Sequence, residues 1–184
     1  MRKALVILMV LCVVGGTAAF ADQLKKGEME TSAMFSYSEV DPRMGIDKLK
    51  QTQLMGAFGY LLTDGHEVGG ELTYMKEEQG NASIDSTLFG VFYNYNFKAG
   101  TNLNPYVGAQ VGSISGSGSG GDTSFSQPYS AYYGVQGGIK IYPWKNGGFN
   151  VGLRWDNWSG KTLNGIKFDD AKVLQLAAGI LIKW

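Results

Sequence analysis

Apolar and polar residues alternate with a period of two over most of the chain, and the carboxyl-terminal twelve residues show this best. Counting back from the last residue in steps of two meets only apolar side chains, namely Trp184, Ile182, Ile180, Ala178, Leu176 and Leu174. The other register mixes glycine, alanine, glutamine and lysine with two apolar residues. Successive side chains of a strand point to opposite faces, so this segment is predicted to be a β-strand with one wholly apolar face.

Seven further segments alternate in the same way, at about 28–40, 50–62, 66–76, 86–98, 104–114, 129–142 and 149–158. Each has about 10 residues or more, the length that a tilted strand needs to cross the hydrocarbon layer of a membrane. Between residues 22 and 184 no apolar run is long enough for a transmembrane helix. With 27 glycines and many aromatic residues, the pattern predicts an all-β fold.

The predicted connections alternate between short and long. Residues 63–65, 99–103 and 143–148 are short and include the turn pairs Asp64-Gly65 and Asn146-Gly147. The longer, more polar connections are 41–49, 77–84, 115–128 and 159–172, and the Gly/Ser-rich part of the third is expected to be a flexible loop. Eight strands joined in this way predict an eight-stranded antiparallel up-and-down transmembrane β-barrel, with short connections on the periplasmic side and long ones outside the cell.

The first 21 residues have the pattern of a secretory signal peptide. Arg2 and Lys3 precede an apolar run, and Ala19-Phe20-Ala21 forms a cleavage site before Asp22. We therefore expect Sec-type export and a single mature domain over residues 22–184. The alternatives are an uncleaved membrane anchor, for which the apolar core is short, and lipidation at Cys12.

Composition excludes several classes of function. The predicted mature chain loses two of 16 basic residues and none of 16 acidic ones, which leaves a weakly acidic chain with no nucleic-acid-binding character. Cys12 is the only cysteine, so a chain cleaved after residue 21 has no disulfide, thiolate metal site or cysteine nucleophile. No cofactor and no enzymatic activity are expected.

Charged residues in the register that faces the barrel interior are the main site candidates. They are Glu67, Glu71, Lys140, Arg154, Asp156 and Lys183, three acidic and three basic. An unpaired charge in a narrow lumen is costly, so we expect ion pairs. Strands three and seven of an eight-stranded ring are opposite, so Glu71 and Arg154 are predicted to meet across the lumen, with Asp156 and Lys140 as further partners. A structural plug is the favoured interpretation, and a proton or ion path is the alternative.

Other candidate residues carry weaker signals. His66, the only histidine, lies at a predicted periplasmic turn near Asp64 and Glu67 but has no nucleophile in its motif. Trp158 near an outer loop is a candidate carbohydrate platform. Four outer aspartates, whose spacing matches no metal motif, are candidate cation ligands: Asp85, Asp122, Asp169 and Asp170. Aromatic residues near strand ends, including Tyr60, Tyr95, Phe97, Trp144, Trp184, Tyr37 and Tyr74, are expected to form interfacial girdles.

Two motifs resemble the small outer-membrane barrels of Gram-negative bacteria, the OmpA, OmpX and OmpW-like group. They are Asn104-Pro105-Tyr106-Val107-Gly108-Ala109 and the terminal strand with its final aromatic residue, which is Trp184 where that group usually has Phe. The resemblance implies location in the cell outer membrane, contact with its lipids and lipopolysaccharide, and recognition by the barrel-assembly machinery. Ile180, Ile182 and Trp184 are the expected assembly signal.

The leading functional hypothesis is a monomeric, non-enzymatic barrel with a structural or surface-interaction role through its extracellular loops. The alternative, suggested by the OmpW-like resemblance, is a narrow transporter for small hydrophobic compounds with a pocket formed by Met55, Leu61, Leu88 and Phe92. A membrane-embedded hydrolase or acyltransferase lacks an outer-leaflet triad. A soluble binding barrel would require the apolar register to face inward.

Overall fold

A computed structural model describes residues 24–40, 49–97, 102–120, 123–126, 128–163 and 165–184. The predicted signal peptide, residues 1–21, lies outside this part of the chain. All regular structure in the described residues is β-strand. No helix among them has the length and apolar character needed to span a membrane.

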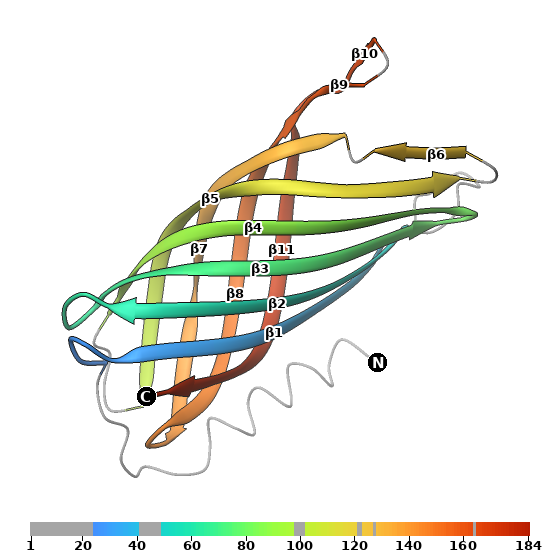
Figure 1. The fold of residues 1–184 in the computed structure, drawn as a ribbon. Helices are drawn as coiled ribbons and strands as arrows, with labels where there is room; N and C mark the ends of the chain where they lie inside the picture. Colours follow the sequence, from blue (N-terminus) through green and yellow to red (C-terminus); the bar gives the residue numbers. More distant parts are fainter. Residues whose placement is uncertain (1–23, 41–48, 98–101, 121–122, 127, 164) are drawn as a thin grey trace.

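Eight long strands form one closed antiparallel sheet, which confirms the predicted barrel (Figure 1). They are β1 (Met29–Val40), β2 (Leu49–Leu61), β3 (His66–Gln79), β4 (Ala82–Asn96), β5 (Leu103–Gly120), β7 (Tyr129–Trp144), β8 (Gly147–Gly160) and β11 (Ala171–Lys183). Each pairs with its neighbours along the chain, and β1 pairs with β11 to close the ring. Closure leaves the ring itself without an open edge, which a membrane barrel requires.

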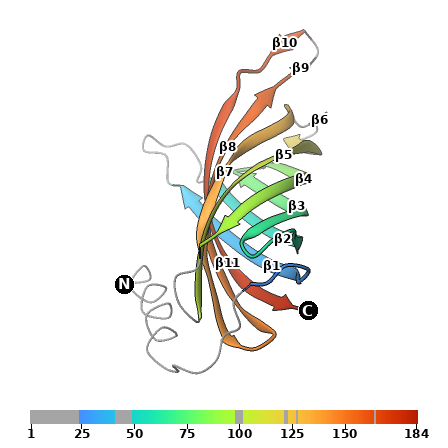
Figure 2. The same ribbon diagram turned by 90° about the vertical axis from the view of Figure 1, so that its left-hand side faces the viewer.

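The two ends of the barrel differ. At one end, called here the turn end, short turns join β2 to β3 and β7 to β8, and the carboxyl-terminal residue Trp184 pairs with Met29 (Figure 1). Gly65 closes the first of these turns with φ +140°, which a side chain would disfavour. The other end is called the loop end, and there the strands extend to different lengths (Figure 2).

Three predicted long connections contain more strand than expected. The 77–84 connection is a two-residue turn, Gly80-Asn81, because β3 and β4 continue to Gln79 and Ala82. The Gly/Ser-rich segment is partly strand, since β5 runs to Gly120 and pairs with β6 (Thr123–Ser126). In the 159–172 connection, β9 (Thr162–Leu163) and β10 (Ile166–Lys167) form a small hairpin that projects from the loop end (Figure 2). The prediction of a flexible loop over the Gly/Ser run is therefore wrong for the residues that lie in β5 and β6.

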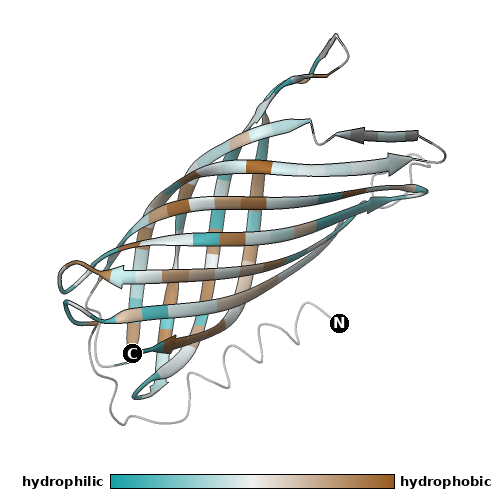
Figure 3. Ribbon diagram, viewed as in Figure 1, coloured by the Kyte–Doolittle hydropathy of each residue, from teal (hydrophilic) through white to brown (hydrophobic). Residues whose placement is uncertain are grey.

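The outer surface of the barrel is apolar. Hydropathy alternates along the strands (Figure 3), and the apolar register points outward, with half or more of the side chain exposed at Phe35, Leu54, Leu72, Phe89, Val91, Val107, Val111, Leu174, Leu176 and Ile180. A soluble binding barrel requires the opposite arrangement. An apolar surface of this extent is characteristic of a protein that faces lipid.

Two small apolar clusters fill the lumen near its ends. At the turn end, Leu24, Leu61, Tyr142 and Leu181 pack together. Toward the loop end, a second cluster contains Met75, Leu88, Ile114, Tyr132 and Trp158. Charged and polar side chains fill the lumen between these clusters.

Candidate functional site

The lumen contains the charged residues that the inward register predicted. Glu67, Glu71, Lys140, Arg154 and Asp156 are all buried, each with 5% or less of its surface exposed. They come from β3, β7 and β8 and form two separate groups along the barrel axis. Buried charges require partners, and each group provides them internally.

The first group, called here the Arg154 layer, contains Glu71, Arg154 and Asp156. Arg154 Nη1 lies 2.7 Å from Glu71 Oε1, and Arg154 Nε lies 2.5 Å from Asp156 Oδ2. The Tyr132 hydroxyl donates a 2.7 Å hydrogen bond to Glu71, and its ring lies 4.8 Å from the guanidinium. Gln110 donates to the other oxygen of Asp156. The layer therefore links β3, β5, β7 and β8 across the lumen.

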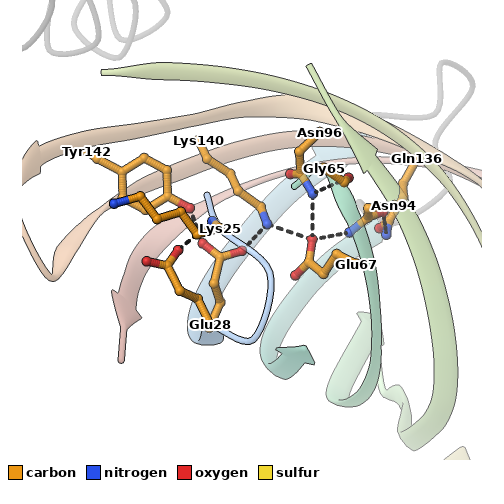
Figure 4. A network of polar contacts seen from close by, with 10 residues as sticks. Lys25, Glu28, Gly65, Glu67, Asn94, Asn96, Gln136, Lys140 and Tyr142 are labelled. Atoms are coloured by element: carbon orange, nitrogen blue, oxygen red, sulfur yellow. Dashed lines mark hydrogen bonds and ion pairs between the residues drawn. The ribbon is translucent and has the colours of Figure 1, made fainter. Parts of the chain in front are cut away.

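The second group, called the Lys140 layer, contains Glu30, Glu67 and Lys140 and lies closer to the turn end. Figure 4 shows Lys140 beside Glu67, with Lys140 Nζ 2.7 Å from Glu67 Oε2. Lys140 also pairs with Glu30, which accepts a second hydrogen bond from Tyr142. The amides of Asn94 and Asn96 donate to the same Glu67 oxygen, each at a distance of 3.2 Å. This layer links β1, β3, β4 and β7.

Two details of the predicted network are wrong. Lys140 does not join Glu71 and Arg154, because its ammonium group is held between Glu30 and Glu67. The balance of three acidic and three basic inward charges is also incorrect, because Glu30 is a fourth buried carboxylate. Glu30 lies in the polar register of the first strand, so the period-two pattern already indicated that its side chain faces the lumen. The predicted inward charge Lys183 pairs with Glu28 at the turn end, 3.3 Å away.

Glycines opposite the large lumen side chains provide the space that these side chains occupy. A Cβ added at Gly90 or Gly112 would collide with the ring or hydroxyl of Tyr132. One added at Gly138 or Gly152 would lie within 2.8 Å of the hydroxyl oxygen of Tyr106. The sequence pattern placed Tyr106 in the same register as the inward Gly108 and Gly112. Tyr132 and Tyr142 were not predicted as lumen residues, although each lies in the inward register. Inward glycines on neighbouring strands are the signal that could have identified them.

A cavity of about 30 Å³ lies between the two charged layers. Met55 and Phe92 of the predicted hydrophobic pocket line it, together with Glu67, Glu71 and Lys140. The other two residues of that pocket lie elsewhere: Leu61 belongs to the turn-end cluster and Leu88 to the loop-end cluster. This volume holds about two water molecules, far less than the roughly 300–1,000 Å³ of typical small-molecule pockets.

His66 lies on the outer face at the turn end. Its Nδ1 is 2.6 Å from the Tyr93 hydroxyl, and its ring packs edge-on against Tyr95 at 5.1 Å. Neither Asp64 nor Glu67 is its hydrogen-bond partner. His66 is therefore part of an exterior aromatic group, which continues to Phe97 through a 4.9 Å ring contact.

The candidate outer sites are not assembled as the sequence suggested. Trp158 has only 2% of its surface exposed, so it is no platform for an external sugar. Asp85 accepts a 2.6 Å hydrogen bond from the Tyr74 hydroxyl, and Asp170 accepts one from Gly160 N–H. Asp122 lies outside the described residues. Within those residues, no group of three or more His, Cys, Asp or Glu side chains is placed to hold a metal ion.

The terminal strand presents the predicted assembly signal on the outer surface. Ile180 and Ile182 are each 55% exposed, and Trp184 is 67% exposed and packs edge-on against Phe58. The predicted girdle aromatics are exposed as well, including Tyr60, Tyr95, Phe97 and Trp144 toward the turn end and Tyr37 and Tyr74 toward the loop end. Their positions at strand ends match those of interfacial aromatic residues in membrane barrels.

Comparison with solved structures identifies the class of fold. The chain superimposes on Neisserial surface protein A with a TM-score of 0.64 and 18% identity, covering 86% of this chain and 100% of that one. The N-terminal barrel domain of Pseudomonas aeruginosa OprF gives 0.57 and 20% identity, covering 86% and 98%. Yersinia pestis Ail, the attachment invasion locus protein, gives 0.56 and 17% identity in its complex with the heparin analogue sucrose octasulfate, covering 86% and 99%.

No protein-family model matches the chain, and no curated protein sequence matches it. The fold is that of the small eight-stranded outer-membrane β-barrels, consistent with the OmpA, OmpX and OmpW-like group.

Proposed function

We propose that this chain is a non-enzymatic, monomeric barrel of the bacterial outer membrane, whose lumen is sealed and whose loop end mediates surface interactions. In this proposal residues 1–21 direct Sec-type export and are removed. The barrel-assembly machinery then recognises Ile180, Ile182 and Trp184, and the barrel contacts outer-membrane lipids and lipopolysaccharide. The turn end faces the periplasm, since short connections do so in this class of barrel.

The observation that supports membrane insertion best is the inverted distribution of polarity. Large apolar side chains cover the outside, whereas the lumen contains two ion-paired layers. Lipid solvates the apolar side chains on the outside, and the closed ring satisfies the backbone hydrogen bonds that lipid cannot. In water the same molecule would expose an apolar surface far larger than monomeric soluble proteins tolerate.

The filled lumen supports an interaction role over transport. Trp158 and Tyr132 close it toward the loop end, Tyr142 closes it at the turn end, and these side chains have 2% or less exposure. A hydrophobic compound would have to displace both apolar clusters and pass two layers of buried charge. Strands stiffened by ion pairs are suited instead to holding loops in fixed positions above the membrane.

The loop end offers a polar surface for contact with other molecules. The extended β3–β4 hairpin carries the exposed pair Lys76–Glu78 at 2.7 Å, and β5 continues as serine and glycine to Gly120. The β9–β10 hairpin projects farther still (Figure 2). A structural relative, Ail, is named for attachment and binds a sulfated sugar analogue in its crystal structure. For this chain we propose only that the loop end contacts external molecules, and we assign no chemical class to them.

Heat-modifiable mobility of the mature protein tests membrane insertion directly. Outer membranes are solubilised in SDS and run on gels with and without boiling, and a folded barrel migrates differently from the boiled chain. A shift in the outer-membrane fraction supports the proposal, whereas recovery in the soluble periplasm with no shift contradicts it. Trp184→Ala is expected to reduce the folded fraction, with Phe168→Ala, an exposed aromatic outside the barrel strands, as the matched control.

Orientation and surface exposure have a separate test. Intact cells are treated with a membrane-impermeant amine reagent, and the modified lysines are identified by mass spectrometry. Lys76 and Lys167 at the loop end should react, whereas Lys145 in the turn between β7 and β8 should react only after lysis. The reverse pattern would contradict the proposed orientation and, with it, a surface role for the loop end.

A further inference from the structure

The two lumen layers contain more negative than positive charge. Each layer sets two carboxylates against one cation. Lys183, the other buried cation in the described part of the chain, pairs with Glu28 at the turn end and lies 5.8 Å from the Tyr142 ring. Each layer therefore holds one negative charge in excess of its own cation, and an uncompensated buried charge is costly.

Hydrogen bonding shows how two of these carboxylates are held. Glu30 accepts from Lys140 on one oxygen and from Tyr142 on the other. Asp156 in the Arg154 layer likewise accepts on both oxygens. Both oxygens of each of these groups therefore already have a partner within the layer. The partner that balances the excess charge is expected at the other two carboxylates.

The remaining two carboxylates line the cavity between the layers. The hydrogen bonds and ion pairs of Glu67 all use Oε2, and those of Glu71 all use Oε1, so one oxygen of each accepts no hydrogen bond from the described residues. Asn150 lines the same cavity, is 6% exposed, and its Oδ1 has no hydrogen-bond partner among them. An unsatisfied buried carbonyl oxygen costs free energy unless water or an ion contacts it.

We infer that this cavity holds a small metal cation together with water, with the free oxygens of Glu67, Glu71 and Asn150 as its protein ligands. Hard cations bind carboxylate, amide and water oxygens, which is the set of groups available here. Lys140 also lines the cavity, but its ammonium is already paired with Glu30 and Glu67. A cavity of about 30 Å³ admits an ion with a water molecule and excludes organic cations.

The test measures how different cations stabilise the purified barrel folded in detergent micelles. Thermal unfolding is followed by circular dichroism in sodium chloride, calcium chloride and N-methylglucamine chloride at equal ionic strength. A ligand that binds only the folded state raises the unfolding midpoint with the logarithm of its concentration once that concentration exceeds its Kd. We expect this dependence for sodium or calcium and no stabilisation by N-methylglucamine, whose ion is too large for the cavity.

Two variants and one spectrum complete the design. Asn150→Ala removes one proposed ligand but neither layer, and should raise the cation concentration at which stabilisation begins roughly tenfold, as the loss of one hydrogen bond to a charge implies. Glu78→Gln, in an exposed ion pair, should leave it unchanged. Equal responses of the wild-type protein to all three salts would overturn the inference. An infrared band of a protonated carboxylic acid at neutral pH would also overturn it, and this measurement uses the wild-type protein alone.

Discussion

Arg154 on β8 and Glu71 on β3 form a 2.7 Å ion pair across the width of the lumen, because their strands are opposite each other in the ring. Both side chains have 5% or less exposure. Asp156 accepts from Arg154 Nε and Tyr132 donates to Glu71, whereas Arg154 Nη2 has no hydrogen-bond partner among the described residues. A pair of this kind contributes little net stability relative to apolar packing, but removing one partner leaves the other charge buried and unpaired. The contact therefore ties two opposite walls of the barrel together.

The first prediction concerns removal of the cation of this pair. Arg154→Met leaves Glu71 and Asp156 buried with no cation in their layer, so the free energy of unfolding should fall by about 3–5 kcal/mol. Urea unfolding of the barrel in lipid vesicles measures this. Lys76→Met, which breaks the exposed Lys76–Glu78 pair, should leave the free energy of unfolding nearly unchanged. Equal losses for the two variants would show that the Arg154 layer is not a buried network.

The second prediction concerns space for Tyr132. A Cβ at Gly90 meets the Tyr132 hydroxyl and lies 2.9 Å from the Val111 carbonyl oxygen, whereas one at Gly56 meets nothing within 4 Å. Gly90→Ala should therefore destabilise the barrel by about 1–3 kcal/mol through overpacking. Gly56→Ala should leave the unfolding free energy nearly unchanged. If both alanines are tolerated equally, Tyr132 does not occupy the lumen as described.

The third prediction concerns the outer face. Val91 is 53% exposed on the apolar surface of β4, and Ser115 faces outward near the loop end of β5. In lipid, Val91→Lys should destabilise the barrel by about 2–4 kcal/mol if it lies near the bilayer midplane, and Ser115→Lys by about 0–1 kcal/mol near the interface. Unfolding in vesicles measures both. Similar small effects would contradict a lipid-facing Val91.

The fourth prediction concerns pH at the loop end. Asp170 Oδ1 accepts a 3.0 Å hydrogen bond from Gly160 N–H, and with a further bond from Asn157 this lowers the pKa of Asp170 below its ordinary value. A lowered folded-state pKa gives stabilisation that is present above the unfolded-state pKa and is lost as the pH falls through the folded-state pKa. Hydrogen exchange at the Gly160 amide should therefore accelerate, relative to other amides, only at acid pH.

A matched pair of variants checks the assignment of that effect. Asp170→Ala should expose the Gly160 amide to exchange at neutral pH as well. Asp169→Ala changes the neighbouring carboxylate, which is not a partner of Gly160, and should retain the wild-type pH profile. Unchanged protection in Asp170→Ala would show that the carboxylate does not hold this amide.

Much of the barrel could be predicted because lipid imposes a strict pattern on the sequence. Between the two interfaces every second residue faces hydrocarbon, so Val91, Leu176 and Ile180 mark the outer register without ambiguity. The inward register followed at once, and it placed Glu71 and Arg154 at similar heights on opposite strands. The structure has a 2.7 Å ion pair at this position.

The same physics explains what sequence reasoning missed. At the loop end both faces of a strand can be polar, so the continuation of β3 to Gln79 and of β5 to Gly120 has no period-two pattern. Tyr132 and Tyr142 resemble interfacial aromatics, and their lumen positions depend on glycines of neighbouring strands rather than on their own segment. Pairing partners within the lumen depend on three-dimensional register, which is why Lys140 was predicted to join Glu71 and Arg154 and instead pairs with Glu30 and Glu67.

Spin-label accessibility on the neighbouring strands β4 and β5 in lipid vesicles tests the lipid-facing surface most directly. Because the predicted mature chain has no cysteine, single nitroxide labels can be placed at Phe89, Val91 and Ser117. Labels at 89 and 91 are expected to collide mainly with oxygen dissolved in the bilayer, and the label at 117 mainly with a water-soluble nickel chelate. Nickel accessibility at 89 and 91 would contradict a lipid-facing apolar surface.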